Sequence, residues 1–367
     1  KIPVLDMIEI GVGGGSIAQV DDRGLIAVGP VSAGAEPGPA CYKRGGARPT
    51  LTDANLLLGY LDAGSFLGGS MRLDPEASRI AMEKDIAAPM GVEVMRTAFG
   101  VREVACESVA RAFRTHAAEQ GVDLRKSVMV AFGGSGPLHG ARVARKLGVS
   151  RLVCPNGSGV MSAFGLLSSP LAYEVVRARR LALDEAGVQI LRAELAAMME
   201  DTTAVLVAAG APSASIGHAI RLDMRYRGQG YEVEVEIDGL DACIPAPLEQ
   251  AFATVYARTF GLAFPDQPAE IVNWKVEAIG PAPGNGTHYR LSVEGASAEA
   301  LKGHRQAWSA DAEAMVPHAV YDRYALTPGT RIDGPALIEE RESTCVLAPG
   351  DRLSVDPHLN LIIDIGA

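Results

Sequence analysis

The pattern of apolar and polar residues in the first half of the chain predicts alternating strands and helices. Residues 1–62 alternate short apolar runs with glycine-rich turns, and residues 74–121 repeat apolar positions at intervals of three and four, which is typical of helices. An apolar run at 127–135 ends at glycines and is followed by a helical pattern and then by the strand-like RLVCPN. Residues 1–183 therefore predict an α/β lobe with a largely parallel sheet covered on both faces.

The second half predicts two further kinds of structure. Residues 184–210 have the pattern of one long helix, and residues 216–238 alternate strongly, as two strands with a turn at RGQG do. A helical segment at 248–260 and the strand-like EIVNWKVEAIG complete an expected α+β domain over 184–289. Short apolar runs interrupted by Pro and Gly predict a β-rich module over 290–367.

Composition narrows the function classes. The chain has 367 residues, with 34 Lys and Arg against 44 Asp and Glu, so its formal charge is −10. The acidic residues are spread along the chain, which argues against nucleic acid as a partner because phosphates need a basic surface. No run is apolar and long enough for a membrane span or a signal peptide, so we expect a cytoplasmic protein without a membrane partner. The five cysteines form no CxxC pair, which disfavours zinc and disulfides: Cys41, Cys106, Cys154, Cys243 and Cys345.

The first candidate binding motif is the glycine cluster in IEIGVGGGSIAQV. Glycines allow backbone N–H groups to surround an anion without interference from Cβ atoms, and Ser16 adds a hydroxyl donor. Gly13, Gly14 and Gly15 are therefore candidates for phosphate binding. The pattern matches neither the Walker motif nor a G-x-G-x-x-G that opens a helix, so a tight β-hairpin is the competing interpretation.

The second candidate motif is VMVAFGGSGPLHG, which joins a predicted strand to a predicted helix. Gly133, Gly134 and Ser135 allow the close approach of a planar or phosphorylated ligand at the helix N-terminus. Pro137 suits the first helical turn. A purely structural turn is the alternative. The two motifs together resemble the second phosphate loop and the adenosine loop of the actin, sugar-kinase and Hsp70 ATPases.

A larger ordered set of motifs resembles the A subunit of the hydantoinase/oxoprolinase family. The set comprises GGGSIA, VGP-SAGA-PGPACY-RGG, PT-TDAN-LLG, FGGSGPLHG, RGQGYE and GPALIEE-ST, and it spans residues 6–350. The resemblance implies an actin-like, RNase H-like ATPase lobe at the start of the chain. It also implies ATP-dependent activation of a cyclic amide (a hydantoin, 5-oxoproline or a lactam) for ring-opening hydrolysis, or, alternatively, activation of a ketone for carboxylation.

The resemblance further implies cofactors, partners and site residues. ATP with Mg²⁺ or another divalent metal would be the cofactor, and a B-type subunit would receive the activated small molecule. Gly13, Gly14, Gly15 and Ser16 would hold the β- and γ-phosphates, and Gly133, Gly134 and Ser135 would lie against the adenosine. Asp53 and His139 are candidates for catalytic groups. The alternatives are that Asp53 caps a helix, that His139 packs within one, and that Cys41 is a small buried filler rather than a reactive thiol.

Two departures from the ATPase pattern qualify this hypothesis. Gly11 occupies the place of an Asp that usually precedes the glycine triplet, and Asp6 and Glu9 are candidate substitutes. The Asp-x-Gly-Gly-Thr motif of the first phosphate loop is absent. The chain also begins without Met, in what reads as the approach to a buried strand. We therefore expect a truncated, processed or split chain whose partner is the missing amino-terminal lobe, and weak ATP binding by the chain alone.

Two other functions remain compatible with the sequence. A sugar-type kinase is disfavoured by the missing first phosphate loop and by the PGPACY segment. A non-catalytic scaffold or regulatory protein with an ATPase fold is favoured by the loss of Asp at the position of Gly11. Substrate-dependent release of ADP or AMP by the co-purified complex separates the enzyme hypotheses from the scaffold.

Overall fold

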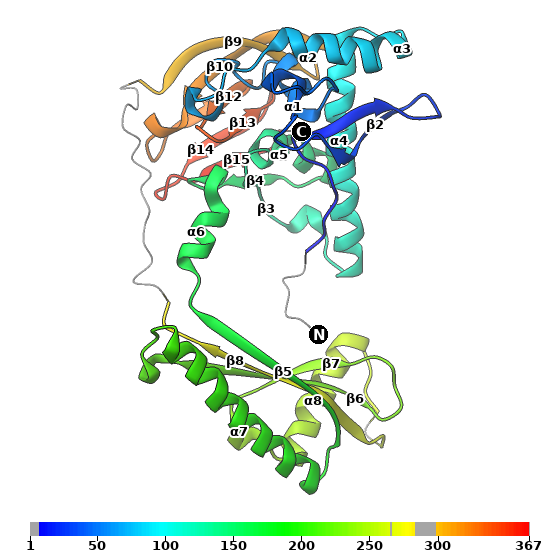
Figure 1. The fold of residues 1–367 in the computed structure, drawn as a ribbon, viewed down its shortest axis with the longest axis vertical. Helices are drawn as coiled ribbons and strands as arrows, with labels where there is room; N and C mark the ends of the chain where they lie inside the picture. Colours follow the sequence, from blue (N-terminus) through cyan, green and yellow to red (C-terminus); the bar gives the residue numbers. More distant parts are fainter. Residues whose placement is uncertain (1–6, 265, 283–298, 367) are drawn as a thin grey trace. The chain divides into compact units, whose positions relative to one another are not determined.

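The computed structural model describes residues 7–264, 266–282 and 299–366. The chain divides into two compact units (Figure 1). The first unit contains the described residues of Asp6–Phe164 and His288–Ala367, and the second contains those of Gly165–Thr287. No helix in the described ranges is long and apolar enough to cross a membrane.

The first unit opens with a β-hairpin and a capped helix. Strands β1 (Ser16–Val20) and β2 (Ile26–Ser32) pair antiparallel. Helix α1 (Leu51–Leu57) begins at Thr50, whose side chain accepts a hydrogen bond from the Asp53 N–H while the Asp53 side chain accepts one from the Thr50 N–H. This reciprocal pair is a capping box, and it explains why the TLTDAN segment starts a helix.

A long helix connects the parts of this unit. Helix α4 (Val94–Glu119) packs against α1, β2 and α5 (Gly136–Leu147). The preceding helical region is interrupted at Gly91, which has a φ of 65° and ends α3. The remaining helical segments of the unit are η1 (Ala40–Tyr42), η2 (Phe66–Gly69), α2 (Pro75–Met82), the π-helical η3 (Glu83–Ala87), α3 (Ala88–Met90), η4 (Leu124–Lys126), η5 (Ser158–Val160), the part of α6 (Met161–Ser168) up to Phe164, and η8 (Arg323–Ala325).

Two further sheets combine strands from both ends of the chain. One has the order β11-β14-β15-β4-β3, and the other has the order β13-β12-β10-β9. Their inner faces, together with α5, form a core that contains Leu152, Leu347 and Ile363, each fully buried. The strands are β3 (Met129–Val130), β4 (Arg151–Cys154), β9 (Leu301–Ser309), β10 (Ala314–Asp322), β11 (Arg331–Asp333), β12 (Ala336–Glu339), β13 (Thr344–Leu347), β14 (Arg352–Val355) and β15 (Leu361–Asp364).

The second unit is an antiparallel sheet packed on helices. Its strands follow the order β5-β8-β6-β7, and α7 and α8 share one hydrophobic core with the sheet. Trp274 of β8 and Phe252 of α8 are each 1 % exposed in that core. The elements are β5 (Ala172–Ala182), α7 (Glu185–Ala208), η6 (Ser213–Ser215), β6 (Gly217–Tyr226), β7 (Val233–Ile237), η7 (Leu240–Ala242), α8 (Pro245–Phe260) and β8 (Ala269–Ile279).

The structure differs from four expectations about the fold. Among the described strand pairs only β3–β4 and β10–β12 are parallel, so the expected largely parallel sheet is wrong. The expected β-rich module does not stand apart, because β15 pairs with β4 inside one sheet. β5 pairs with β8, so the second unit includes residues before the expected boundary at 184. Of the strand expected at the start of the chain, residues 1–6 lie outside the described residues, and residues 7–10 form no strand.

Candidate functional site

The two glycine loops of the first unit meet at one cavity of about 240 Å³. Gly13 of the first loop lines it from one side, and Ser135, Gly136 and His139 line it from the other. A Cβ placed on Gly14 would lie 3.6 Å from Ser135 Oγ, which shows how closely the loops approach. The remaining lining is mainly apolar: Val12, Leu51, Ala105, Cys106, Val109, Phe113, Met129, Val130, Ala131, Phe132, Gly140 and Val143.

Hydrogen bonds to its carbonyl groups hold the first loop in place. The Ser16 N–H donates to Gly13 O, at 2.9 Å, and Gly14 O accepts from both the N–H and the hydroxyl of Thr52, each at 2.9 Å. Gly15 O accepts from Ala33 N–H. In the described part of the chain, the N–H groups of Gly14 and Gly15 have no acceptor. The loop precedes β1, so it is not the turn of the β1–β2 hairpin.

Ser16 contributes to the loop itself. Its hydroxyl accepts from Gly13 N–H at 2.9 Å and donates to Gly11 O at 3.3 Å, and the residue is 3 % exposed. The direct hydroxyl donor to phosphate that the sequence suggested is therefore already engaged within the loop.

The second loop leads into α5 and leaves backbone N–H groups at the N-terminus of this helix unpaired. Ser135 is the N-cap but makes no capping side-chain bond, and Pro137 occupies the first turn. Within the described residues, the N–H groups of Gly134, Ser135 and Gly136 have no acceptor. Unpaired amides at a helix N-terminus favour an anion through both hydrogen bonds and the helix dipole. The other side of the loop is anchored, because Ser343 Oγ donates to the carbonyl groups of Gly133 and Gly134.

His139 lines the cavity as a neutral side chain. Asn55 Nδ2 donates to His139 Nε2 at 3.2 Å, and His139 Nδ1 lies 3.5 Å from Cys106 Sγ. Burial, with a smaller contribution from the positive charge of Arg102, lowers the pKa of His139 from 6.5 to about 3. A histidine with that pKa is a weak base at neutral pH, so its geometry supports hydrogen bonding and packing more directly than proton transfer.

Asp53 is fully buried and surrounded by donors. Its carboxylate accepts from the N–H groups of Ala40, Cys41 and Thr50 and from the hydroxyls of Thr50 and Ser78, at 2.6–3.2 Å. These bonds tie the PGPACY segment to the start of α1. The geometry therefore favours the helix-capping alternative over contact with a metal or water. Cys41 is also fully buried, and burial and Asp53 raise the pKa of its thiol far above the usual range, as expected for a filler.

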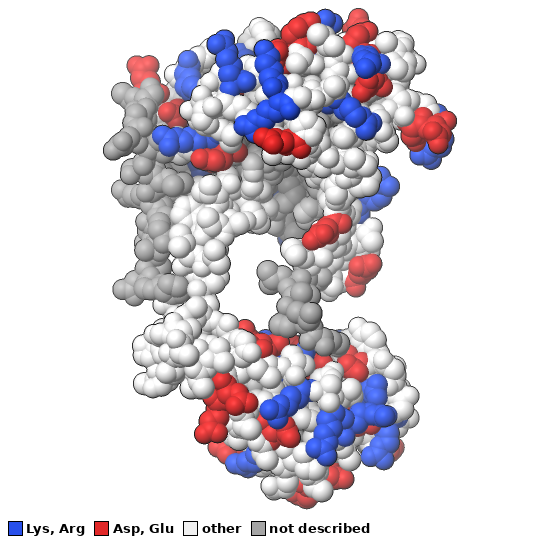
Figure 2. All heavy atoms as spheres, viewed as in Figure 1, with Lys and Arg blue, Asp and Glu red and all other residues white. Residues whose placement is uncertain are grey.

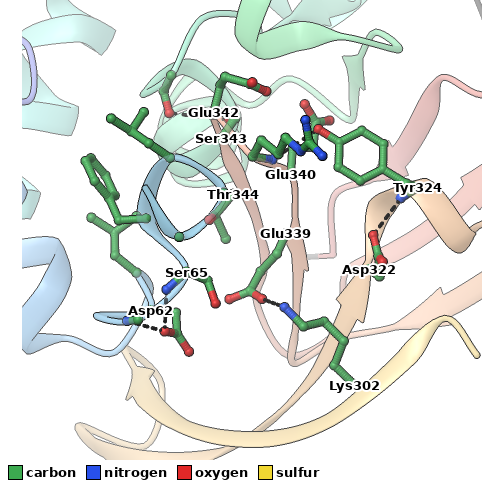
Figure 3. Close-up of a pocket in the computed structure, with 18 residues that line it drawn as sticks. Asp62, Ser65, Lys302, Asp322, Tyr324, Glu339, Glu340, Glu342, Ser343 and Thr344 are labelled. Carbon is green, nitrogen blue, oxygen red and sulfur yellow. Dashed lines mark hydrogen bonds and ion pairs between the residues drawn. The ribbon is translucent and has the colours of Figure 1, made fainter. Parts of the chain in front are cut away.

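A second, polar cavity of about 290 Å³ has Gly134 of the second loop among its lining residues. Figure 3 shows the side chains that line it. Asp62 approaches from the loop after α1, Lys302 from β9 and Glu339 from β12. Lys302 and Glu339 form an ion pair within the cavity, and Asp62 accepts from the N–H groups of Gly64 and Ser65. Further carboxylates of the lining belong to Asp322, Glu340 and Glu342.

Burial shifts the pKa of one of these carboxyl groups. It raises the pKa of Glu340 despite the ion pair with Arg323 at 3.1 Å and the hydroxyl of Ser158. No role was predicted for these groups, although Glu339, Glu340 and Ser343 lie in the GPALIEE-ST motif that carried the resemblance. The GPALIEE-ST motif was the one sequence feature that pointed to these residues. That they lie in one cavity with Gly134 is visible only in the tertiary structure.

In the view of Figure 2, basic and acidic side chains are interspersed on both units and form no continuous patch of one sign. Within the described ranges, no cluster of three or more His, Cys, Asp or Glu residues is arranged to hold a metal ion.

Comparison with known proteins identifies the family. The hydantoinase/oxoprolinase profile matches residues 1–175, and the hydantoinase/oxoprolinase C-terminal domain profile matches residues 182–363. The chain therefore belongs to the hydantoinase/oxoprolinase family, as its motifs predicted.

Three relatives place the chain within that family. Caprolactamase subunit alpha of Pseudomonas jessenii is 34 % identical over 97 % of this chain and 52 % of that protein. The structure of the ATP-dependent caprolactamase from that organism matches with a TM-score of 0.75, at 32 % identity, over 97 % of this chain and 52 % of that one. Nucleotide-free acetone carboxylase, a structure described under ATP-dependent acetone carboxylation, matches with a TM-score of 0.80 at 25 % identity, over 96 % of this chain and 52 % of that one. The 5-oxoprolinase of Dictyostelium discoideum is 29 % identical over 100 % of this chain and 29 % of that protein. The chain spans about half the length of the first relatives it matches.

Proposed function

We propose that this chain is the carboxy-terminal part of an ATP-dependent A-type subunit that activates a cyclic amide for ring-opening hydrolysis. The observation that carries the proposal is the meeting of two glycine loops in which the N–H groups of Gly14, Gly15, Gly134, Ser135 and Gly136 lack acceptors in the described chain. Similarity to a caprolactamase subunit and to a 5-oxoprolinase supports an amide as the substrate class. The finer fold assignment, an actin-like ATPase lobe, belongs to the same proposal.

The arrangement of the two loops fits ATP. Gly14, Gly15 and the first turn of α5 offer backbone N–H donors to phosphate oxygens. The mainly apolar cavity beside Gly13 suits a planar base, and of the three residues proposed to lie against the adenosine, Gly133, Gly134 and Ser135, it is Ser135 that lines this cavity. When bound, ATP would supply a phosphoryl group to the amide oxygen, which makes the carbonyl carbon more electrophilic toward water before the ring C–N bond breaks.

The polar cavity fits a different part of the reaction. Its carboxylates repel phosphate, but they accept hydrogen bonds from N–H and hydroxyl groups. Asp62 and Glu339 are already ion-paired with Arg305, so Glu342 is the carboxylate proposed to orient a neutral ligand such as the substrate amide or the ribose. Gly134 lies between this cavity and α5, so a ligand there would be held close to the nucleotide.

In this proposal the active enzyme contains two parts in addition to this chain. We propose that the first phosphate loop lies in an amino-terminal lobe and that a B-type subunit acts on the activated substrate. A Mg²⁺ ion that accompanies ATP would be held by nucleotide oxygens and water, with few ligands from protein side chains.

A second candidate function is ATP-dependent carboxylation of a ketone. The observation that favours it is the TM-score of 0.80 with acetone carboxylase. Phosphorylation of an enol oxygen and of an amide oxygen place similar demands on the loops described above. The two functions therefore differ mainly in what the second subunit does.

The test is nucleotide turnover by the assembled complex. The full-length subunit, co-purified with its partners, is supplied with ATP and a panel of lactams, hydantoins, 5-oxoproline and ketones. We expect release of ADP or AMP that depends on a cyclic amide and is accompanied by the ring-opened acid. Turnover that needs a ketone and bicarbonate instead would select the carboxylase, and no stimulation by any member of the panel would favour the scaffold.

A further inference from the structure

The peptide planes of the two glycine loops are held through their carbonyl groups. In a planar trans peptide, the C=O of one residue and the N–H of the next residue point in opposite directions. A hydrogen bond to a carbonyl therefore also fixes the direction of the N–H that follows it. Because glycine has no Cβ, a peptide next to glycine turns more easily than one between larger residues. A glycine loop thus needs an outside contact to keep its N–H donors in one direction.

Thr52 provides such a contact for the first loop. Its hydroxyl and its N–H each donate to Gly14 O at 2.9 Å. The N–H of Gly15 belongs to the same peptide, so it points away from Thr52, and it has no acceptor in the described chain. Thr52 is 6 % exposed and lies in the first turn of α1, whose start is fixed by the capping box. A firmly held side chain therefore orients a free donor.

Ser343 holds the second loop in the same way. Its hydroxyl donates to Gly134 O at 3.3 Å and lies 3.5 Å from Gly133 O. The N–H groups that follow these two carbonyls belong to Gly134 and Ser135, and both lack an acceptor among the described residues. Ser135 also lines the apolar cavity. The two donors that the loop can offer to a ligand therefore point away from Ser343.

Ser343 is itself held firmly by the turn between β12 and β13. Glu340 N–H donates to Ser343 O at 2.8 Å, and the two strands pair antiparallel on either side of the turn. The turn packs closely on its surroundings, since a Cβ on Gly159 would lie 2.6 Å from Glu342 Cβ. Ser343 is 7 % exposed. A hydroxyl on a turn of this kind has little freedom to move, which is what support of a binding loop requires.

We infer that Ser343 and Thr52 are positioning residues for ATP, whose hydroxyls hold the peptide planes of the glycine loops with their free N–H donors turned toward the nucleotide. The nucleotide is that of the proposed function, on which this inference rests. Neither side chain touches the nucleotide itself. Ser343 should matter more than Thr52. Gly14 O keeps its bond to Thr52 N–H when that hydroxyl is removed, whereas Ser343 reaches Gly134 O through its hydroxyl.

Steady-state kinetics of the assembled complex test the role of each hydroxyl. Ser343→Ala and Thr52→Val each remove one hydroxyl from a loop contact. Ser108→Ala is the matched control, because Ser108 Oγ donates to Val104 O at 2.9 Å within α4 and lines neither cavity. We expect the KM for ATP to rise about tenfold in Ser343→Ala and about threefold in Thr52→Val, with kcat at saturating ATP within about twofold of wild type. Ser108→Ala should match wild type in both.

A purely structural role predicts a different result. Loss of folded enzyme would lower the melting temperature and kcat and leave the KM for ATP unchanged. An unchanged KM for ATP in folded Ser343→Ala would therefore contradict the inference. If Ser343→Ala does not fold, Thr52→Val decides in the same way.

Crystal structures separate this inference from the proposed function. In Ser343→Ala without nucleotide, we expect the peptides that follow Gly133 and Gly134 to turn or to occupy two orientations. A wild-type complex without affinity for ATP would contradict the proposed function, and the orientation of these peptides in the variant would still decide whether Ser343 holds the loop. Unchanged peptide planes in Ser343→Ala would overturn the role of Ser343.

Discussion

At the scale of single residues, the buried polar groups of the candidate region mainly hold loops in place. Asp53 gathers five donors from three segments, and Ser16 closes its own glycine loop. These side chains have their hydrogen-bonding capacity used inside the protein. The groups left free for a ligand are backbone N–H groups, which fits recognition of phosphate by glycines rather than by charged side chains.

The first expected outcome concerns Asp53. Asp53→Asn replaces one acceptor oxygen by a donor that faces N–H and O–H groups, so we expect the free energy of unfolding to fall by about 3 kcal/mol. Asp21→Asn is the matched control in the exposed β1–β2 turn, and its effect should stay below about 1 kcal/mol. Denaturant titration of both variants measures this. An Asp53→Asn protein that keeps its stability but loses turnover would instead assign Asp53 a catalytic role.

The second expected outcome is that His139 makes the free energy of unfolding depend on pH. Its folded-state pKa of about 3 lies below the unfolded value of 6.5, so between these values the unfolded chain binds one more proton. Stability from this group is complete above pH 6.5 and falls as the pH decreases, by about 1.4 kcal/mol per pH unit. His139→Gln lacks this contribution, so the stability difference between wild type and variant should change with that slope between pH 6.5 and 4.5. A difference that does not vary with pH would show that His139 titrates normally.

At the scale of elements, sequence periodicity predicted local structure better than strand pairing. The helices at α1, α5, α7 and α8 and the β6–β7 pair were predicted from apolar spacing and turn residues, and they are present. The parallel sheet was not found, because apolar strands of two to four residues carry no signal about their neighbours. β4 pairs with β15 across more than half of the chain, which local patterning does not encode.

The candidate site shows the same division between local and tertiary information. The glycine loops were predicted from composition, and the structure brings them to one cavity. The polar cavity was not predicted, because its carboxylates come from the loop after α1, from β10, from β12 and from the segment that follows β12. Whether a glycine's N–H is already paired also depends on tertiary contacts, such as the bond that Gly133 N–H donates to Ser158 O.

At the scale of the whole molecule, the chain order predicts which parts can fold alone. The described second unit is continuous in sequence and has its own core around Trp274. The first unit needs both ends of the chain, because β15 covers β4 and the shared core contains Leu152 and Ile363. A domain with its own core and a continuous chain folds independently more readily than one whose sheet is shared between distant segments.

The two units should therefore differ in whether they fold as isolated fragments. Residues 165–282 expressed alone should unfold cooperatively on heating, with the near-ultraviolet signal of a packed Trp274. Residues 7–164 alone should not reach a native state, and adding residues 299–366 in trans should restore it. Circular dichroism and a thermal melt of each fragment provide the measurement. Cooperative folding of residues 7–164 without the carboxy-terminal strands would contradict the shared sheet.

The most direct test of the central claim is the affinity of the complete complex for ATP when one loop glycine is changed. Gly13 is the suitable position, since a Cβ there meets no atom within 4 Å and would enter the cavity, whereas at Gly14 it would lie 2.8 Å from Thr52 Oγ1. Gly217 in β6 is equally unobstructed and serves as the control. We expect Gly13→Ala to weaken ATP binding by roughly tenfold or more at an unchanged melting temperature, because a methyl group displaces the nucleotide beyond hydrogen-bonding distance. Gly217→Ala should bind as wild type does. A folded Gly13→Ala complex with wild-type affinity for ATP would contradict the assignment of the nucleotide to these loops.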